Sequence, residues 1–193
     1  MASFPACGVF FEIYPMKKNY TAHRHLPLAW ERLHHDTRLL ARHLIERGPW
    51  KGIVSVARGG LIPASIIARE LDIRLVDCLS IISYDDRVQG EARVIKSVHT
   101  DLVQDGTGWI IVDDLVDSGK TARLVKKLLP NSHMATVYAK PEGMAFVDTY
   151  AVSMDQDVWL LFPWEAELMP NEPLARHPSV QAEETVPPSQ PVC

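Results

Sequence analysis

An apolar run that ends in two adjacent acids constrains the fold of this chain more than any other feature. Residues 109–112 read Trp-Ile-Ile-Val, and Asp113 and Asp114 follow them directly. A short, continuously apolar run of this kind is typical of a buried strand in a parallel sheet. Because open α/β sheets bind ligands at the carboxyl ends of their strands, the two acids predict a functional edge.

The residues that follow predict a phosphate site. Residues 117–121 read Asp-Ser-Gly-Lys-Thr, a small polar loop that opens into a predicted helix, Thr121–Leu129. Backbone N–H groups at a helix N-terminus form a natural anion site. Two acids beside such a loop suggest a phosphorylated sugar with Mg²⁺ nearby.

Competing motifs fit this stretch less well. A P-loop ending in Gly119-Lys120-Thr121 needs a glycine five residues before Gly119, where the chain has Asp114. The dinucleotide pattern G-x-G-x-x-G does not occur there either. A receiver-like phosphoacceptor domain stays open, because such domains also carry acids at strand ends.

Composition excludes several classes of function. The chain has 193 residues, of which 47% are hydrophobic, so it can form one domain with a sizeable core. A net charge of −4 without a basic stripe argues against nucleic-acid binding. Three cysteines without metal-like spacing fit a reducing compartment. We find no signal peptide and no apolar run near the roughly 20 residues that span a bilayer.

Strand and helix patterns alternate along the chain, which predicts an α/β fold with a mostly parallel central sheet flanked by helices. Apolar residues at spacings of three and four predict the first helix, and short apolar runs predict the strands. The expected helices are Leu28–Arg47 and Ile62–Leu71, and the expected strands are Gly52–Val56, Arg74–Ser83, Ile110–Val112 and Met134–Ala139.

Other segments are assigned by their polarity. Tyr84–Gly108 is long and polar, and we predict a mobile flap with some strand pairing around the apolar patch 92–98. Tyr150–Val152 and Val158–Phe162 are predicted as small strands of a separate hood lobe. The expected organisation is an irregular extension (1–25), one domain (26–169) and a disordered, proline-rich tail (170–193).

Three further positions fit a site at the same edge. Arg58-Gly59-Gly60 follows the first sheet strand, where glycines admit an anion close to the backbone and the arginine can bind its oxygens. Lys140 ends a later strand and could donate to a carbonyl group. Trp159 offers a face on which a planar base could stack. Taken singly, each also fits a plain turn, a solvated lysine or a core tryptophan.

The stretch 110–121 resembles the ribose-phosphate motif of the type I phosphoribosyltransferases. The chain from about Leu28 to about Trp164 further resembles one subgroup, the bacterial xanthine-guanine phosphoribosyltransferases. The matching segments are Trp50–Val54, Arg58–Pro63, Ala68–Leu71, Ile82–Asp85, Ala139–Pro141, Asp157–Trp159 and Pro163–Trp164.

The resemblance implies a reaction, its partners and a role for each site residue. The substrates would be 5-phospho-α-D-ribose 1-diphosphate (PRPP) and xanthine, guanine or possibly hypoxanthine, with Mg²⁺ as cofactor. Asp117 would be the catalytic base or acid near N7 of the purine. Asp114 would face the metal, Lys140 would read the 6-oxo group, Trp159 would stack on the ring, and the backbone at Trp159 and Leu160 would meet the 2-substituent. The PRPP-binding residues would be Arg58, Gly59, Asp113, Asp114, Asp117, Ser118, Gly119, Lys120 and Thr121.

The resemblance also implies that the loop at Arg58 often carries a non-proline cis peptide. One position departs from the subgroup, which has a flap arginine where an ungapped alignment places Gly90. Arg87 or Arg93 could substitute if the flap is rearranged.

Alternatives stay open at this stage. A lysine cannot accept from the exocyclic amine of adenine, so Lys140 disfavours that base, but it does not separate xanthine from hypoxanthine. A non-catalytic regulator of the same fold is a second class, disfavoured by the intact acids. The resemblance implies a homo-oligomer, commonly a tetramer, in the cytoplasm and possibly peripheral on the inner membrane face.

Overall fold

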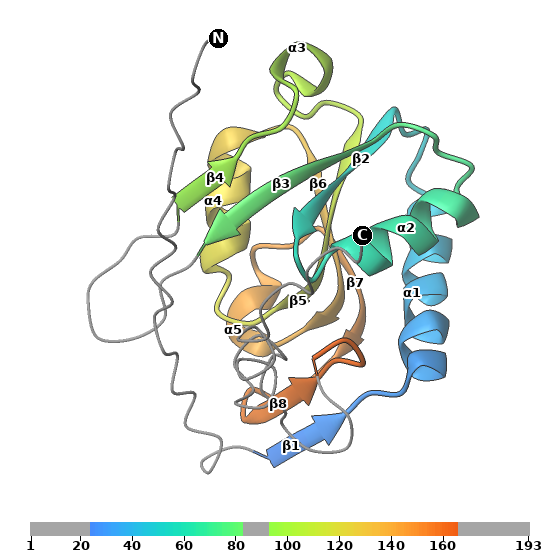
Figure 1. Cartoon of the computed structure of the whole chain (residues 1–193), viewed down its shortest axis with the longest axis vertical. Coiled ribbons are helices and arrows are strands. Elements are labelled where there is room, and N and C mark those ends of the chain that lie inside the picture. The colour runs from blue at the N-terminus through green and yellow to red at the C-terminus, as the bar shows by residue number, and fades with distance from the viewer. Residues whose placement is uncertain (1–23, 83–92, 166–193) are drawn as a thin grey trace, which may run out of the picture.

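The computed structural model describes residues 24–82 and 93–165. Most of the predicted N-terminal extension, the flap residues 83–92 with Gly90, and the proline-rich tail therefore lie outside the described residues. The described chain confirms the α/β class: a six-stranded sheet has the order β4-β3-β2-β5-β6-β7, with helices on both sides (Figure 1).

Five strands of this sheet are parallel, and the first four of them were predicted. They are β2 (Gly52–Ala57), β3 (Val76–Ile82), β5 (Trp109–Val116), β6 (His133–Ala139) and β7 (Thr149–Ser153). The edge strand β4 (Arg93–Lys96) runs antiparallel to β3. The apolar patch predicted within the flap therefore does pair as a strand.

The helices lie close to their predicted ranges. The long ones are α1 (Trp30–Ile45), α2 (Leu61–Glu70) and α4 (Lys120–Leu128). Two single-turn helices, α3 (Thr100–Val103) and α5 (Pro141–Met144), were not predicted. Within the ranges 24–82 and 93–165, no helix has the length and apolar character needed to cross a membrane.

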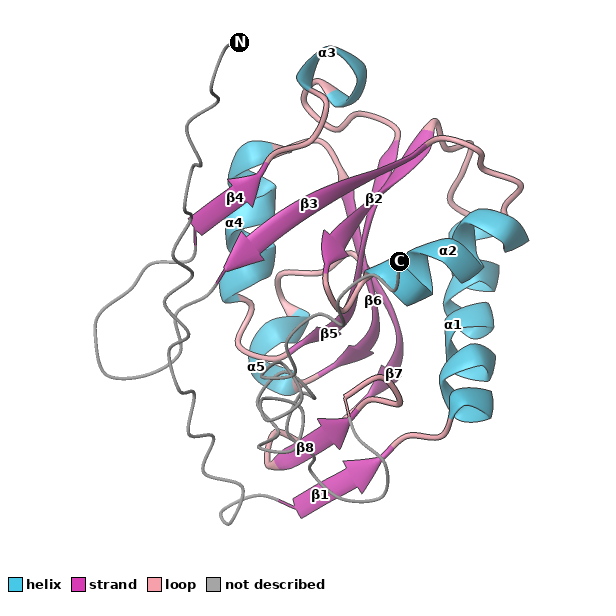
Figure 2. Cartoon of the chain, viewed as in Figure 1, coloured by secondary structure: helices cyan, strands magenta, loops and turns pink. Residues whose placement is uncertain are grey.

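The central strand β5 is covered on both faces. Successive side chains of a strand point to opposite sides. Ile110 and Val112 join the core that includes α1 and α2, whereas Trp109 and Ile111 join the core that includes α4. Figure 2 shows these helices on opposite sides of the sheet. The run needs no polar alternation, because neither face meets solvent.

The acids lie inside β5 rather than beyond it. We predicted a strand that ends at Val112, but β5 continues to Val116 and still pairs with β6 there. Asp113 pairs with Thr136 in the ladder. The strand was predicted too short because the polar side chains of Asp113 and Asp114 indicated a loop, although β5 continues through both residues.

A second, two-stranded sheet forms the hood. It pairs β1 (Arg24–Pro27) with β8 (Val158–Leu161) in parallel. Strand β1 was not predicted and overlaps the last two residues of the expected extension. Tyr150–Val152 was assigned to this lobe, and that prediction is wrong: these residues lie in β7, which pairs with β6 in the main sheet.

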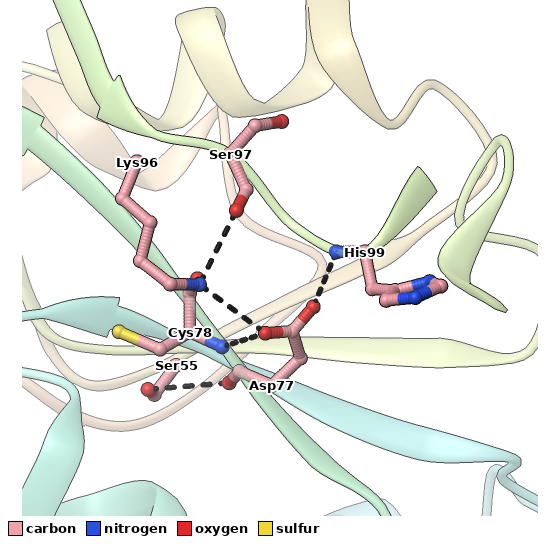
Figure 3. A network of polar contacts seen from close by, with 6 residues as sticks. All are labelled: Ser55, Asp77, Cys78, Lys96, Ser97 and His99. Atoms are coloured by element: carbon pink, nitrogen blue, oxygen red, sulfur yellow. Dashed lines mark hydrogen bonds and ion pairs between the residues drawn. The ribbon is translucent and has the colours of Figure 1, made fainter. Parts of the chain in front are cut away.

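A polar network secures the segment that returns from the flap (Figure 3). The Asp77 carboxylate on β3 accepts hydrogen bonds from the backbone N–H of Cys78 (2.7 Å) and of His99 (2.6 Å). Lys96 on β4 donates to the same carboxylate (3.4 Å) and to the Cys78 carbonyl (2.6 Å). Burial opposes ionisation of Asp77, but these donors outweigh it and hold its pKa below the usual value. The base of the flap is thus tied to β3.

A second network crosses the core between α1 and β6. Asp36 is buried in α1, and its carboxylate accepts from the Tyr138 hydroxyl (3.0 Å) and from Arg32 Nε (2.6 Å). Burial would raise the pKa of Asp36, but its hydrogen bonds with Arg32, His35 and Tyr138 lower it overall. Buried charges persist only where such partners satisfy them.

We predict that Tyr138→Phe destabilises the protein by about 1–3 kcal/mol, since it removes a donor from a buried carboxylate. Urea unfolding would measure this loss. Tyr150→Phe is the matched control, because Tyr150 is an exposed side chain on the neighbouring strand β7. Equal unfolding midpoints for the two variants would contradict the structural role of the Tyr138 hydroxyl.

Candidate functional site

Three neighbouring parallel strands bring the predicted site residues to one edge. β2 leads into Arg58, β5 carries Asp113 and Asp114, and β6 ends directly before Lys140. The ladder pairs Val116 with Ala139, and the Lys140 N–H donates to the Val116 carbonyl (2.9 Å). The common edge inferred from the sequence is therefore present (Figure 1).

The turn after β2 lies against the acids of β5. A Cβ atom at Gly59 would collide with the Asp114 carboxyl group, so a larger residue here would require that side chain to move. The peptide bond between Ala57 and Arg58 is cis, as the resemblance implied. Arg58 itself is exposed at the same edge, where its guanidinium is accessible to an anion.

The two acids of β5 resist ionisation in the unliganded protein. Burial and the neighbouring Asp114 charge raise the pKa of Asp113 well above its usual value. Burial also raises the pKa of Asp114 to about 6, assisted by the charge of Glu165 and opposed by the hydrogen bond from the Leu115 N–H (2.7 Å). Among residues 24–82 and 93–165, no positive charge is found to lower the pKa of either acid, so a cation or cationic group at this point would be favourable.

The polar loop meets the N-terminus of α4, as predicted. Gly119 has a φ of 74°, in the left-handed region, and a Cβ there would overlap the Phe146 ring. The guanidinium of Arg123, on α4, stacks over that ring at 4.4 Å from its centroid. The first N–H groups of α4 have no partner within the helix, so loop and helix together can receive a phosphate.

Asp117 is held from two sides. Lys140 Nζ lies 3.1 Å from Asp117 Oδ2, and Gln156 Nε2 donates to Oδ1 at 2.7 Å. Lys140 is buried, which corrects the alternative of a solvated strand-end lysine, whereas half of the Asp117 side chain is exposed. A buried ammonium next to an accessible carboxylate can present a donor and an acceptor to the same ligand.

The structure places the remaining predicted residues on the expected elements. Trp159 lies in β8 and is half-buried, while the Leu160 side chain packs into the core, leaving its backbone for any contact. Ser118 and Thr121 are half-buried in the loop and the first turn of α4, and Lys120 is exposed.

Sequence reasoning missed two contributors to the site. Gln156 and Phe146 come from segments without a recognisable motif, and their roles depend on contacts across the fold. Gln156 stands three residues before Trp159, but its spacing indicates no chemistry. Only the three-dimensional arrangement identifies it.

The acids can serve a magnesium ion without a complete protein cage. In residues 24–82 and 93–165, no group of three or more His, Cys, Asp or Glu side chains could hold a metal. Mg²⁺ commonly uses one or two carboxylates together with water and substrate phosphates. Asp113 and Asp114 fit that pattern.

The glycine turn, the acid pair and the loop at the N-terminus of α4 define an α/β fold with an anion-binding edge. A match to a family model shows that the chain belongs to the phosphoribosyl transferase family. The family model for the phosphoribosyl transferase domain matches residues 29–171. This confirms the family resemblance drawn from the acid-rich loop.

Named relatives are similar over most of their length. A xanthine-guanine phosphoribosyltransferase of Nitratidesulfovibrio vulgaris (strain DP4) is 50% identical over 153 residues, which cover 79% of this chain and 91% of the relative. One from Cereibacter sphaeroides is 47% identical, covering 82% and 97%. Among solved structures, a purine phosphoribosyltransferase from Pyrococcus horikoshii superposes with a TM-score of 0.63 at 26% identity, covering 77% of this chain and 99% of that one.

We predict that Asp114→Asn stabilises the metal-free protein at neutral pH. A carboxyl whose pKa rises on folding costs stability as the pH increases from its unfolded value near 4 to its folded value of about 6. The variant lacks this ionisation, so its advantage over the wild type should grow to ~3 kcal/mol above pH 6. Thermal unfolding with a chelator at pH 4 and pH 8 measures it. A difference that does not change with pH would contradict the assigned ionisation.

Proposed function

We propose that the protein transfers the phosphoribosyl group of PRPP to N9 of xanthine or guanine, forming XMP or GMP and pyrophosphate in purine salvage. The observation that carries this proposal is the Asp117–Lys140 pair beside the acid pair of β5. The names and high identity of the relatives support the choice of bases.

In the proposed complex, the sugar phosphate would lie along the edge with its 5′-phosphate at the loop and its pyrophosphate at Arg58. The loop 117–121 and the N-terminus of α4 would hold the 5′-phosphate. Asp113 and Asp114 would face the ribose hydroxyls, and Arg58 with the Gly59 backbone would bind the pyrophosphate. In this orientation, C1′ would lie between the turn after β2 and the Asp117–Lys140 pair.

Magnesium is part of the proposal, with Asp114 as its principal protein ligand. When bound, the ion would neutralise charge that develops on the leaving pyrophosphate. Arg58 would stabilise the same charge from the protein side. The raised pKa of Asp114 supports the assignment, because a cation would favour its ionised form.

The base would be recognised by donor and acceptor together. Lys140 would donate to the 6-oxo oxygen, Trp159 would stack on the ring, and the backbone at Trp159 and Leu160 would meet the 2-substituent. N9 then bonds to C1′ as the C1′–O bond to pyrophosphate breaks, with its electron pair leaving on the pyrophosphate oxygen. Asp117 would take the proton that the base loses at its imidazole ring.

A second specificity, for hypoxanthine and guanine, has one supporting observation. Hypoxanthine carries the same 6-oxo group that Lys140 would bind, so this contact alone does not reject it. The relatives that are 50% and 47% identical to this chain are named for xanthine and guanine. These names favour those bases. A non-catalytic regulator is disfavoured by the same relatives, since they are named as enzymes.

The decisive assay incubates the protein with PRPP and Mg²⁺ and, separately, xanthine, guanine, hypoxanthine and adenine. We expect nucleotide from xanthine and guanine, none from adenine, and loss of product when the metal is chelated. Product from hypoxanthine and guanine alone would support the second specificity. Tight PRPP binding without product from any base would favour the regulator.

We predict that Asp117→Asn lowers kcat by about 10²- to 10⁴-fold, the usual contribution of a general acid or base. The fold should persist, because the amide retains the size of the carboxyl group. Asp101→Asn is the control, since Asp101 is an exposed acid on α3. Steady-state kinetics with guanine measure both variants, and near-normal turnover of Asp117→Asn would refute its role.

Two broader properties are proposed on the family resemblance alone. One is a homo-oligomeric state, commonly a tetramer, which light scattering of the purified protein would measure. The other is a cytoplasmic location with possible peripheral association at the inner membrane face, which cell fractionation would test.

A further inference from the structure

The side-chain amide of Gln156 makes one hydrogen bond through its nitrogen and one through its oxygen, and together these fix the orientation of the amide. It lies in the turn between β7 and β8, and its Nε2 donates to Asp117 Oδ1 at 2.7 Å. Its Oε1 accepts from the backbone N–H of Glu142 at 3.1 Å. Exchanging the amide oxygen and nitrogen would place two acceptors together and two donors together, so both contacts select the same rotamer.

The hydrogen bond from Glu142 connects Gln156 to the helix α5. Glu142 lies in the first turn of α5, where backbone N–H groups have no partner within the helix. The same helix packs closely on the phosphate loop, because a Cβ at Gly143 would lie 2.6 Å from the Asp117 carbonyl oxygen. Gln156 therefore fixes the Asp117 side chain relative to the backbone that carries it.

Lys140 alone would hold Asp117 less well during turnover. In the proposed reaction its ammonium also donates to the 6-oxo oxygen of the base, so the Lys140–Asp117 contact is shared once the base binds. The Gln156 contact is on the other carboxylate oxygen and involves no group assigned to the substrate. As a neutral donor, it orients the carboxylate without adding a second positive charge.

We propose that Gln156 is a positioning residue that holds the Asp117 carboxylate toward the base while Lys140 is engaged by the substrate. This inference rests on the proposed function. It assigns to the β7–β8 turn a role separate from base stacking: the segment that carries Trp159 also sets the direction of the catalytic carboxylate.

The test is a double-mutant cycle between Gln156→Met and Asp117→Asn, assayed with PRPP and guanine. Methionine keeps the length of glutamine but makes neither hydrogen bond. We expect Gln156→Met to lower kcat roughly 10- to 100-fold, as for loss of a hydrogen bond to a charged group, with the KM for PRPP changed less than about twofold. In the Asp117→Asn background, the same change should lower kcat by less than about twofold, because the carboxylate that it positions is already absent.

Two further variants complete the design. Gln156→Glu should be at least as harmful as Gln156→Met, since it sets a carboxylate against Asp117. Asp157→Asn is the matched control, because Asp157 is an exposed neighbour in the same turn, and it should retain wild-type kcat.

The outcomes separate this inference from the proposed function. Equal losses from Gln156→Met in both backgrounds would show a structural role independent of Asp117 and would overturn the inference, as would wild-type kcat in Gln156→Met. If the wild-type protein forms nucleotide from no base, the proposed function fails and the inference falls with it, a result visible before any variant is made.

Discussion

Burial of β5 on both faces is the constraint on which the rest of the structure depends. Helices cover each side of this strand, and its backbone pairs with β2 over Trp109–Val112 and with β6 between Ile110 and Val116. Two carboxyl groups follow in the same strand and inherit its position. The sheet therefore delivers Asp113 and Asp114 to an edge where Arg58 and Lys140 also arrive, each from an adjacent strand.

The unliganded site is an electrostatic arrangement that favours a ligand. Within the described residues, no opposite charge compensates Asp113 and Asp114, whereas Lys140 is paired with Asp117. A bound cation would compensate the charge of the acid pair, and the 6-oxo oxygen of the base would give Lys140 a second acceptor. Since a nearby cation favours the ionised form of these carboxyl groups, the site would favour a sugar phosphate that binds together with a metal ion.

Local patterns predicted most of the main sheet and the edge at which Arg58, the acids of β5 and Lys140 lie. Three features consist of residues adjacent in the sequence and could therefore be predicted from it: the apolar run of β5, the small polar loop and the turn at Arg58. The two-stranded hood, the place of Tyr150 in β7 and the role of Gln156 were not. Each depends on pairing between distant segments, for which a single sequence holds no periodic signal. The predicted end of β5 was too early, because Asp113 and Asp114 are polar at positions where a buried strand ordinarily has apolar residues.

The pairing of β1 with β8 has a consequence for how the protein is made. Arg24 on β1 forms its ion pair with Asp155, 131 residues further along the chain. At ordinary rates of synthesis, β1 waits roughly ten seconds for its partner to leave the ribosome. The sheet edge that would bind the sugar phosphate can form earlier, since its strands are complete at Ala139. The nascent chain would therefore acquire its phosphate-binding half first, and the base-binding half would close last.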